Sequence, residues 1–483
     1  MTKIPFNTEA AGAGGKGASF TKQLGTPVSR RNLLKLGGFG LAAAAGSSML
    51  AACSPGPTSG ASGGGSKTIN VMVSQSPTAP EGQKRILDLM RQKFEAAHPG
   101  NTVKFDVVQL GSAVSNAVVN TAATKEGPDI FEVGPQVLPT GAATGVFTPL
   151  SDSEWSDLGG KDRYLASVLA VTGKDNKDHV AIPYYASTMA MYYNKKMFAD
   201  AGIPGAPTTW NGFIETGQKL SDASAGKFAV GDAAGEPTQP WHVIWLLTTQ
   251  LGGQLISPDG RTALLNSPEV VQGISFWLDW MAKYKIVNQR DATNTSAQQI
   301  QQFVKKQNAM FPCGFTQAIS SMPGTPVEKE WALAGNPTVP YGQQSMPNGA
   351  KPVQSYLGGA TWAISKFSKN RDLALGLAKI MGDPDVQQLT WKEVGGLPTT
   401  NETFTKYPET RAGDWKVIYD AAVSAQSTPW SPSFGQVSPL LAAAVKPSFA
   451  ELAAGGSYKT DTLKAQLDTA NEKLKAALNS EKR

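Results

Sequence analysis

Residues 182–198, IPYYASTMAMYYNKKMF, are the stretch that decides the fold. Apolar and aromatic runs at 180–183 and 189–193 predict two strands. The chain before them alternates strands with helices, whereas no helix fits between these two. The pattern of the chain therefore breaks at this stretch and restarts after it.

Toward the N-terminus the alternation is regular. Strands are predicted at 68–73, 103–108 and 127–131, and helices at 81–98 and 113–125. Strands that alternate with helices of 10 to 15 residues indicate βαβ units. The fold class is therefore α/β, with a parallel sheet covered on both faces.

Toward the C-terminus, apolar residues at helical spacing predict helices at 210–220, 268–284 and 463–478. No internal repeat is visible. A chain of 483 residues exceeds what a single core usually supports, so two lobes are expected.

Composition excludes several classes of protein. A mean hydropathy of −0.22 and the lack of a second long apolar run argue against a polytopic membrane protein. Residues 1–52 hold six of the 44 basic residues and one of the 38 acidic ones, so the rest of the chain is nearly neutral. The net charge of +6 is therefore no evidence for nucleic-acid binding.

The N-terminus has the pattern of an export signal over residues 1–52. SRRNLLK at 29–35 precedes an uncharged stretch and resembles a twin-arginine signal. The stretch ends Leu50-Ala51-Ala52-Cys53, which resembles a lipobox with cleavage before Cys53 and lipid on its thiol. Residues 53–66 then form a flexible tether of small residues. The alternative is a transmembrane anchor, although the uncharged stretch is shorter and less apolar than a membrane-spanning helix requires.

Motifs for catalysis or metal binding are absent from the sequence. The three histidines, at 98, 179 and 242, lack a second histidine at metal-ligand spacing, and there is no Cys-x-x-Cys. No Gly-x-Ser-x-Gly elbow is present. Cys313 is expected to be a buried thiol, and no cofactor or metal is expected. A pair of carboxylates that converge only in the fold stays open as an alternative.

Aromatic residues instead occur in loop-like settings beside proline and glycine. They include Tyr185, Trp241, Phe315, Trp362 and Trp430. Each has a core role as its alternative. Ring faces beside amide, hydroxyl and backbone groups are nevertheless what a sugar-binding site needs, because sugar C–H faces stack on rings while hydroxyls need hydrogen bonds.

Across most of residues 67–483 the chain resembles the family 1 extracellular solute-binding proteins of bacterial ABC importers, of the maltose-binding type. The resemblance rests on the order and spacing of many short segments. They are 127–130 (GPDI), 142–150 (AATGVFTPL), 182–184 (IPY), 192–198 (YYNKKMF), 201–203 (AGI), 207–210 (PTTW), 251–253 (LGG), 303–310, 358–359 (GG), 364–366 (ISK), 368–370 (SKN) and 396–398 (GLP).

The resemblance implies a two-lobed binding protein of the class II type, with discontinuous lobes joined by hinge crossings. One lobe would hold 67–185 and about 361–405, and the other about 188–358 and about 406–483. The crossings are expected near 185–187 and 358–361, with a further return after Leu397. Closure would be a hinge motion around the ligand.

The loop aromatics and the positions that the resemblance aligns with ligand contacts together make up the candidate site. Val133 and Gln136 stand where the maltose-binding type has an aromatic residue and a carboxylate, so the charged contact is missing and maltose itself is in question. The candidate ligand-binding residues are Gln75, Ser76, Gln136, Tyr185, Ser187, Trp241, His242, Phe315, Gly359, Trp362, Trp430 and Phe434.

The expected function is therefore capture of a mono- or oligosaccharide and its delivery to an ABC permease, without catalysis. The protein would be a monomer held at the outer face of the cell membrane by lipid on Cys53. Three alternatives stay open: the same fold with a polyol phosphate or polyamine as ligand, a secreted carbohydrate-active enzyme, and a structural lipoprotein.

Overall fold

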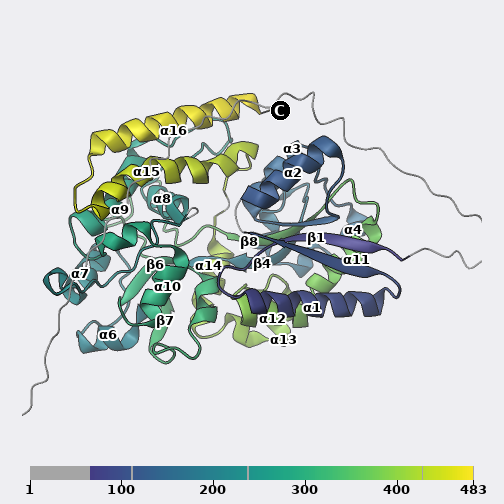
Figure 1. Ribbon diagram of the computed structural model, residues 1–483, viewed down its shortest axis with the longest axis horizontal. Coiled ribbons are helices and arrows are strands. Elements are labelled where there is room, and N and C mark those ends of the chain that lie inside the picture. The colour runs from purple at the N-terminus through teal and green to yellow at the C-terminus, as the bar shows by residue number, and fades with distance from the viewer. Residues whose placement is uncertain (1–65, 110–111, 237–238, 427, 482–483) are drawn as a thin grey trace, which may run out of the picture. The chain divides into compact units, whose positions relative to one another are not determined.

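The computed structural model describes residues 66–109, 112–236, 239–426 and 428–481 (Figure 1). The predicted export signal, Cys53 and the tether up to residue 65 lie outside these residues. Among the helices of the described residues, none is both long enough and apolar enough to cross a bilayer.

The first sheet has five strands in the order β2-β1-β3-β8-β4 (Figure 1). Their bounds are β1 (Thr68–Ser74), β2 (Thr102–Val108), β3 (Ile130–Val133), β4 (Ile182–Ser187) and β8 (Gly358–Ile364). β1 pairs in parallel with β2 and β3, whereas β8 pairs antiparallel with both β3 and β4. The prediction of a parallel sheet is therefore wrong for β8, which runs antiparallel to both of its neighbours. It does so because the chain enters this sheet from the second one in the opposite direction.

Helices cover both faces of this sheet, as predicted. Ile130 of β3 packs into a core formed with α1 (Pro80–Ala97), α11 (Arg371–Met381) and α12 (Pro384–Val394). Phe131, the next residue, packs into the opposite core with α2 (Ser112–Thr124) and α3 (Leu138–Ala143). Successive strand residues point to opposite faces, so a continuous apolar run buries both sides of a central strand.

The second sheet has three antiparallel strands in the order β6-β5-β7. They are β5 (Met189–Asn194), β6 (Met310–Phe315) and β7 (Trp331–Ala334). Its main core includes the fully buried rings of Trp210, Trp277 and Trp280. The larger helices on this side are α7 (Trp210–Leu220), α8 (Gln239–Gln250), α9 (Pro268–Ala282), α10 (Ser296–Val304), α15 (Val437–Ala453) and α16 (Thr460–Ser480).

The remaining helices are short, apart from α14. They are α4 (Asp152–Asp157), α5 (Ala166–Ala170), α6 (Lys195–Asp200), α13 (Asn401–Lys406) and α14 (Asp414–Ser424). Helix starts follow local chemistry: the Thr209 side chain accepts a hydrogen bond from the backbone N–H of Gly212 at the start of α7. Ser267 does the same for Val270 in α9, with Pro268 at the first helical position.

The first passage of the chain from one sheet to the other is a single residue, Thr188, which separates β4 from β5. Next to it, Ala186 exchanges two backbone hydrogen bonds of 2.9 Å with Leu397, and lies opposite Gly359 of β8 on its other side. Three segments distant in sequence therefore meet at this crossing, close to the positions expected for the hinge.

Gly359 is at the crossing because no other residue fits there. Its φ of +116° is one that residues with a side chain rarely adopt. A Cβ at this position would lie 2.1 Å from the carbonyl oxygen of Tyr185, which is backbone and cannot move aside easily.

Two buried carboxyl groups lie on the side of the second sheet. Asp232 accepts hydrogen bonds of 2.9 Å from the Trp277 indole and from the backbone of Ala233, and burial raises its pKa to about 7. Asp291 accepts bonds of 2.9 Å from Asn294 and Gln302, and burial raises its pKa to about 6.

We expect Gly359→Ala to lower the free energy of unfolding by about 3 kcal/mol or more, because it combines backbone strain with overlap. Gly455→Ala is the matched control, because Gly455 also has a positive φ (+81°) but has nothing within 4 Å of the added methyl group. The control should cost only about 1 kcal/mol. Denaturant titration measures both, and equal losses would contradict the crowding at the crossing.

Stability should depend on pH because these carboxyls hold protons more tightly in the folded state than in the unfolded state, where an aspartate pKa is about 3.9. The free energy of unfolding should therefore be highest near pH 4 and fall as the pH rises toward 8, by roughly 2–4 kcal/mol for Asp232. Denaturation midpoints across this range should fall less steeply in Asp232→Asn, with the exposed Asp162→Asn as the control for a lost charge. A slope identical to wild type in Asp232→Asn would contradict this.

Candidate ligand-binding cleft

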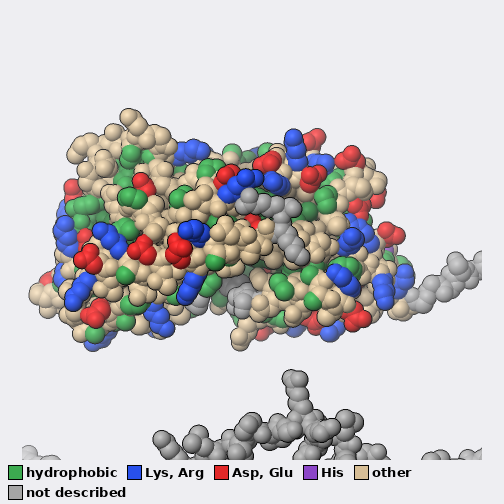
Figure 2. All heavy atoms as spheres, turned by 90° about the horizontal axis from the view of Figure 1, so that it is seen from above, with side chains coloured by type: hydrophobic (Ala, Val, Ile, Leu, Met, Phe, Trp, Pro, Cys, Tyr) green, Lys and Arg blue, Asp and Glu red, His purple; other side chains and the backbone are tan. Residues whose placement is uncertain are grey.

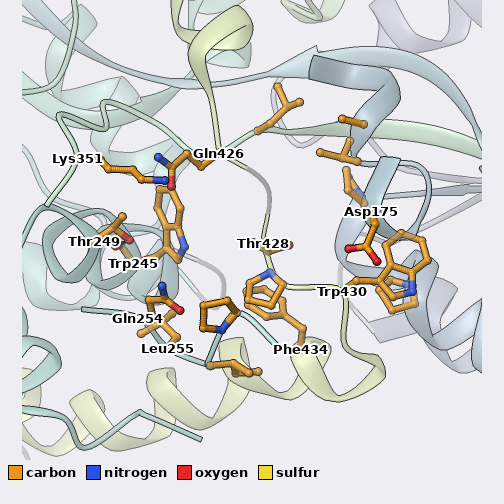
Figure 3. Close-up of a pocket in the computed structure, with 18 of the residues that line it drawn as sticks. Asp175, Trp245, Thr249, Gln254, Leu255, Lys351, Gln426, Thr428, Trp430 and Phe434 are labelled. Carbon is orange, nitrogen blue, oxygen red and sulfur yellow. Dashed lines mark hydrogen bonds between the residues drawn. The ribbon is translucent and has the colours of Figure 1, made fainter. Parts of the chain in front are cut away.

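A cavity of about 450 Å³ opens between the two sheets (Figure 3). Loops and helices from the sides of both sheets line it. From the side of the first sheet it is lined by Pro135, Pro139, Ala170, Val171, Gly173, Asp175 and Asn176. From the other side it is lined by residues of α8, of 252–258 and of 349–357, and residues Gln426, Thr428, Pro429, Trp430 and Phe434 line it between the two sides, with Trp430 nearest Asp175. The cavity is within the range of small-molecule sites, roughly 300–1,000 Å³.

Aromatic rings stand at opposite sides of the cavity. Trp245 is on α8, next to Thr249 and Gln254, whereas Trp430 lies across from it, near Asp175 (Figure 3). Phe434 lies below Thr428, between the two tryptophans (Figure 3). These rings can stack on the apolar face of a flat ligand.

Neutral hydrogen-bonding groups lie between the rings. Side chains of this kind come from Asn176, Thr249, Gln254, Gln426 and Thr428. Among the described lining residues only Asp175 and Lys351 carry charge, and their charges are opposite. The cavity is therefore built for a ligand with many hydroxyl or amide groups and no large net charge.

Of the candidate residues named from the sequence, Trp430 and Phe434 line this cavity. Trp241 does not: it is 5% exposed and packs against Tyr356 and Phe434, with ring centroids 4.9 and 5.7 Å apart. Trp241 is therefore not among the residues that line the cavity, and its contact with a ligand stays a prediction. Trp245, one helical turn later, lines the cavity instead.

Trp241, His242, Phe315 and Tyr356 form a layer of contacting rings, which we call the layer behind Trp245. The His242 ring lies parallel to that of Tyr356, its Nε2 is 2.9 Å from the Tyr356 hydroxyl, and its centroid is 4.8 Å from that of Phe315. Burial lowers the pKa of His242 well below its usual value, so the imidazole is neutral. His242 and Phe315 support the cleft wall and are not among its lining residues.

Tyr185, Ser187 and Gly359 lie at the crossing. The Ser187 hydroxyl is 3.0 Å from that of Thr316 and donates to Gln317 at 3.2 Å, and the half-buried Tyr185 ring packs on Tyr184. These residues join segments from both sheets, and they too are outside the lining of the cavity.

Trp362 is fully buried in the core of the first sheet. It faces the buried Glu132, whose pKa burial raises to about 7, and the Trp362 side chain opposes that rise. Trp362 is enclosed and does not line the cavity, and its contact with a ligand stays a prediction.

Gln75, Ser76 and Gln136 have local partners. The exposed Gln75 donates its backbone N–H to Val108 at 2.7 Å, and the Ser76 hydroxyl accepts from the backbone of Ala79 at 3.1 Å, before α1. Gln136 folds over its own turn at Gly134, while its neighbour Pro135 lines the cavity.

Sequence reasoning missed Trp245, Gln254, Lys351 and Asp175. Trp245 had a signal, because it stands four residues after Trp241 on the same helix and helical periodicity allows either ring to face the ligand. Gln254 follows the LGG segment at 251–253 directly. Lys351 and Asp175 come from irregular segments, where no periodicity indicates which way a side chain points.

Within the residues that the structure describes, no group of three or more histidine, cysteine or acidic side chains is arranged to hold a metal ion. The site as built can bind, orient and enclose a ligand through stacking and hydrogen bonds.

Comparison with known proteins agrees with this geometry. The family model described as bacterial extracellular solute-binding protein matches residues 77–388. The diacetylchitobiose-binding protein DasA of Streptomyces coelicolor is 27% identical over 355 residues, which cover 72% of this chain and 75% of that protein.

Solved structures with the same fold include the maltose-bound MalE3 of T. maritima, with a TM-score of 0.69 and 18% identity, covering 85% of this chain and all of that one. A solute-binding protein of Agrobacterium radiobacter K84 in complex with ribitol gives a TM-score of 0.70 at 19% identity, covering 86% of this chain and 99% of that one. The two-lobed fold of the periplasmic binding proteins, with lobes joined by hinge crossings, is thus confirmed. The chain belongs to the bacterial extracellular solute-binding protein family, whose members are the substrate-binding components of ABC importers.

Proposed function

We propose that this protein captures an uncharged oligosaccharide in the cleft and delivers it to the permease of an ABC importer. The observation that carries the proposal is the pair of tryptophans, Trp245 and Trp430, on opposite sides of a cavity whose other polar groups are mainly neutral. A sugar offers apolar C–H faces for the rings and hydroxyls for the amides, so the two kinds of group match.

The first ligand to test is di-N-acetylchitobiose. The relative named for binding diacetylchitobiose aligns with 72% of this chain, which supports a ligand of this kind. An acetamido group is neutral and has an amide and a methyl, and the cleft offers both Gln254 and Gln426 and apolar neighbours such as Leu255 and Val171. Maltose and ribitol are the competing ligands.

Closure would occur about the crossing at Thr188, Gly359 and Leu397. The lobes that move would be those proposed from the sequence, 67–185 with about 361–405, and about 188–358 with about 406–483. A ligand that contacts both walls binds the closed form better than the open one, and this difference in affinity is what shifts the equilibrium. The permease would recognise the closed, loaded form.

Delivery requires the protein to stay near its permease. Lipid on Cys53 would hold a monomer at the outer face of the cell membrane, and the tether at 53–66 would leave the body free to rotate. A flexible tether of the thirteen residues 54–66 would span roughly 20 Å on average.

Isothermal titration against a panel of sugars tests the proposal. Di-N-acetylchitobiose, maltose, ribitol and a polyol phosphate are titrated into the protein, and at least one uncharged sugar should bind with micromolar or tighter affinity. Saturation by the polyol phosphate alone would replace the sugar with a charged ligand. Binding followed by hydrolysis would favour an enzyme, and no saturable binding across the panel would exclude a sugar receptor.

Trp245→Ala should weaken sugar binding roughly fivefold or more, because stacking on an aromatic ring is worth about 1 kcal/mol or more and this ring forms a wall of the cleft. Both rings are buried, with Trp245 6% exposed and Trp241 5%, so both changes should lower the melting temperature. Trp241→Ala is the matched comparison one turn earlier on α8, and it should weaken binding less than Trp245→Ala, because Trp241 is not among the residues that line the cavity. The reverse pattern, with binding lost only in Trp241→Ala, would contradict the assignment of the wall to Trp245.

A further inference from the structure

Asp175 and Lys351 line the cleft from opposite sides, as Figure 3 shows. Both side chains are exposed, whereas Trp245, Leu255 and Phe434 of the same cavity are buried. The buried residues make the floor of the cavity, so the two charges stand at its rim. Neither charge forms an ion pair with any residue that the structure describes.

The segment that carries Asp175 is anchored and strained. We call residues 173–178 the rim loop. Its base is closed by the buried Thr172, whose carbonyl accepts from the backbone of Val180 at 2.9 Å and whose hydroxyl lies 3.0 Å from Nδ1 of His179. The loop therefore has a defined place against the first sheet.

Within the rim loop, Asp175, Asn176 and Asp178 have φ angles of 52°, 55° and 46°. Residues with a side chain rarely adopt such angles, and Asn and Asp tolerate them best. Strained conformations persist only where the surrounding structure enforces them, and they concentrate at functional sites. Here the strain holds Asp175 and Asn176 at the cavity.

Lys351 belongs to the opposite wall. Its carbonyl accepts from the backbone of Val353 at 2.7 Å, and its neighbour Ala350 packs near Gly252, which also lines the cavity. Lys351 and Asp175 thus lie on opposite walls of the cavity. A rotation that narrows the mouth of the cavity would bring the two charges closer together.

We propose that Asp175 and Lys351 form an ion pair across the mouth of the cleft when it closes, and so stabilise the closed, loaded form. The inference rests on the proposed function, because it assumes closure around a ligand. The pair would act as a latch: each charge would contact the opposite charge on the other lobe, and neither would contact the faces of the sugar that stack on the rings. Opposite charges that meet only in the closed form would stabilise that form alone. Because the ligand binds the closed form, such a contact raises the apparent affinity without touching the ligand.

A double-mutant cycle tests the pairing. Affinity for di-N-acetylchitobiose, or for maltose if the first does not bind, is measured in wild type, Asp175→Asn, Lys351→Gln and the double variant at 10 mM and 500 mM salt. For an exposed pair each single change should weaken binding roughly two- to fivefold at low salt, and the double variant should be no weaker than the singles. At high salt, where screening acts over a few ångströms, the four proteins should converge.

Asp178→Asn is the matched control, because it removes a charge from the same loop at a similar φ angle but does not line the cavity. It should leave affinity and its salt dependence as in wild type. A loss in Asp175→Asn with none in Lys351→Gln, or additive losses that persist at high salt, would overturn the latch and indicate direct contact of Asp175 with ligand.

A second measurement does not need a known ligand. In the full chain with Cys53→Ser, the variant Asp175→Cys with Lys351→Cys is treated with a short bismaleimide, and Cys313 stays buried. Because both charges are gone, the cross-linking rate tests only whether positions 175 and 351 approach each other, and it should exceed the rate for Asp178→Cys with Lys351→Cys. Equal rates would overturn the latch even if sugar binds, whereas a faster rate in a protein that binds none of the sugars would count against the proposed function alone.

Discussion

The backbone of Ala186 is hydrogen-bonded to Leu397 on one side and lies opposite Gly359 on the other. This contact joins the three segments through which the chain passes between its two sheets, and the rest of the structure depends on it. A side chain at Gly359 would separate β8 from β4 at the point where both leave the first sheet. Because only Thr188 lies between β4 and β5, the connection between the two sheets is very short at this point.

The layer behind Trp245 links the crossing to the cleft. Tyr356 is two residues before β8 begins, its ring contacts Trp245 at 6.0 Å, and its hydroxyl meets His242. Leu357, the next residue, donates to the carbonyl of Gln426, which lines the cavity. The floor of the cleft and the start of β8 are therefore parts of one packed unit, which would support Trp245 if a ligand stacks on it.

Local patterns were sufficient to predict the regular elements near the N-terminus and three of the later helices. Strands β1 to β5, helices α1 and α2, the start of α9 at Ser267-Pro268 and the covering of both sheet faces follow from side-chain period and capping chemistry. Helices α11 and α12, which also cover the first sheet, were not predicted. The direction of β8 could not be predicted in this way, because it depends on a return from the other sheet over a long irregular segment. The site was harder still. Trp241 and Trp245 have the same local signal and both are buried, and only the tertiary packing determines which of them lines the cavity.

The two kinds of charge in the molecule have different roles. Glu132, Asp232 and Asp291 are enclosed and titrate near neutrality because burial opposes their ionisation, so they influence stability more than recognition. Asp175 and Lys351 are exposed at the rim, where water screens them. The proposed closure would remove part of that water and strengthen their attraction, since the same pair interacts more strongly in a lower dielectric. A cleft with a neutral interior and charged rims would thus hold a neutral ligand without selecting for charge in the ligand itself.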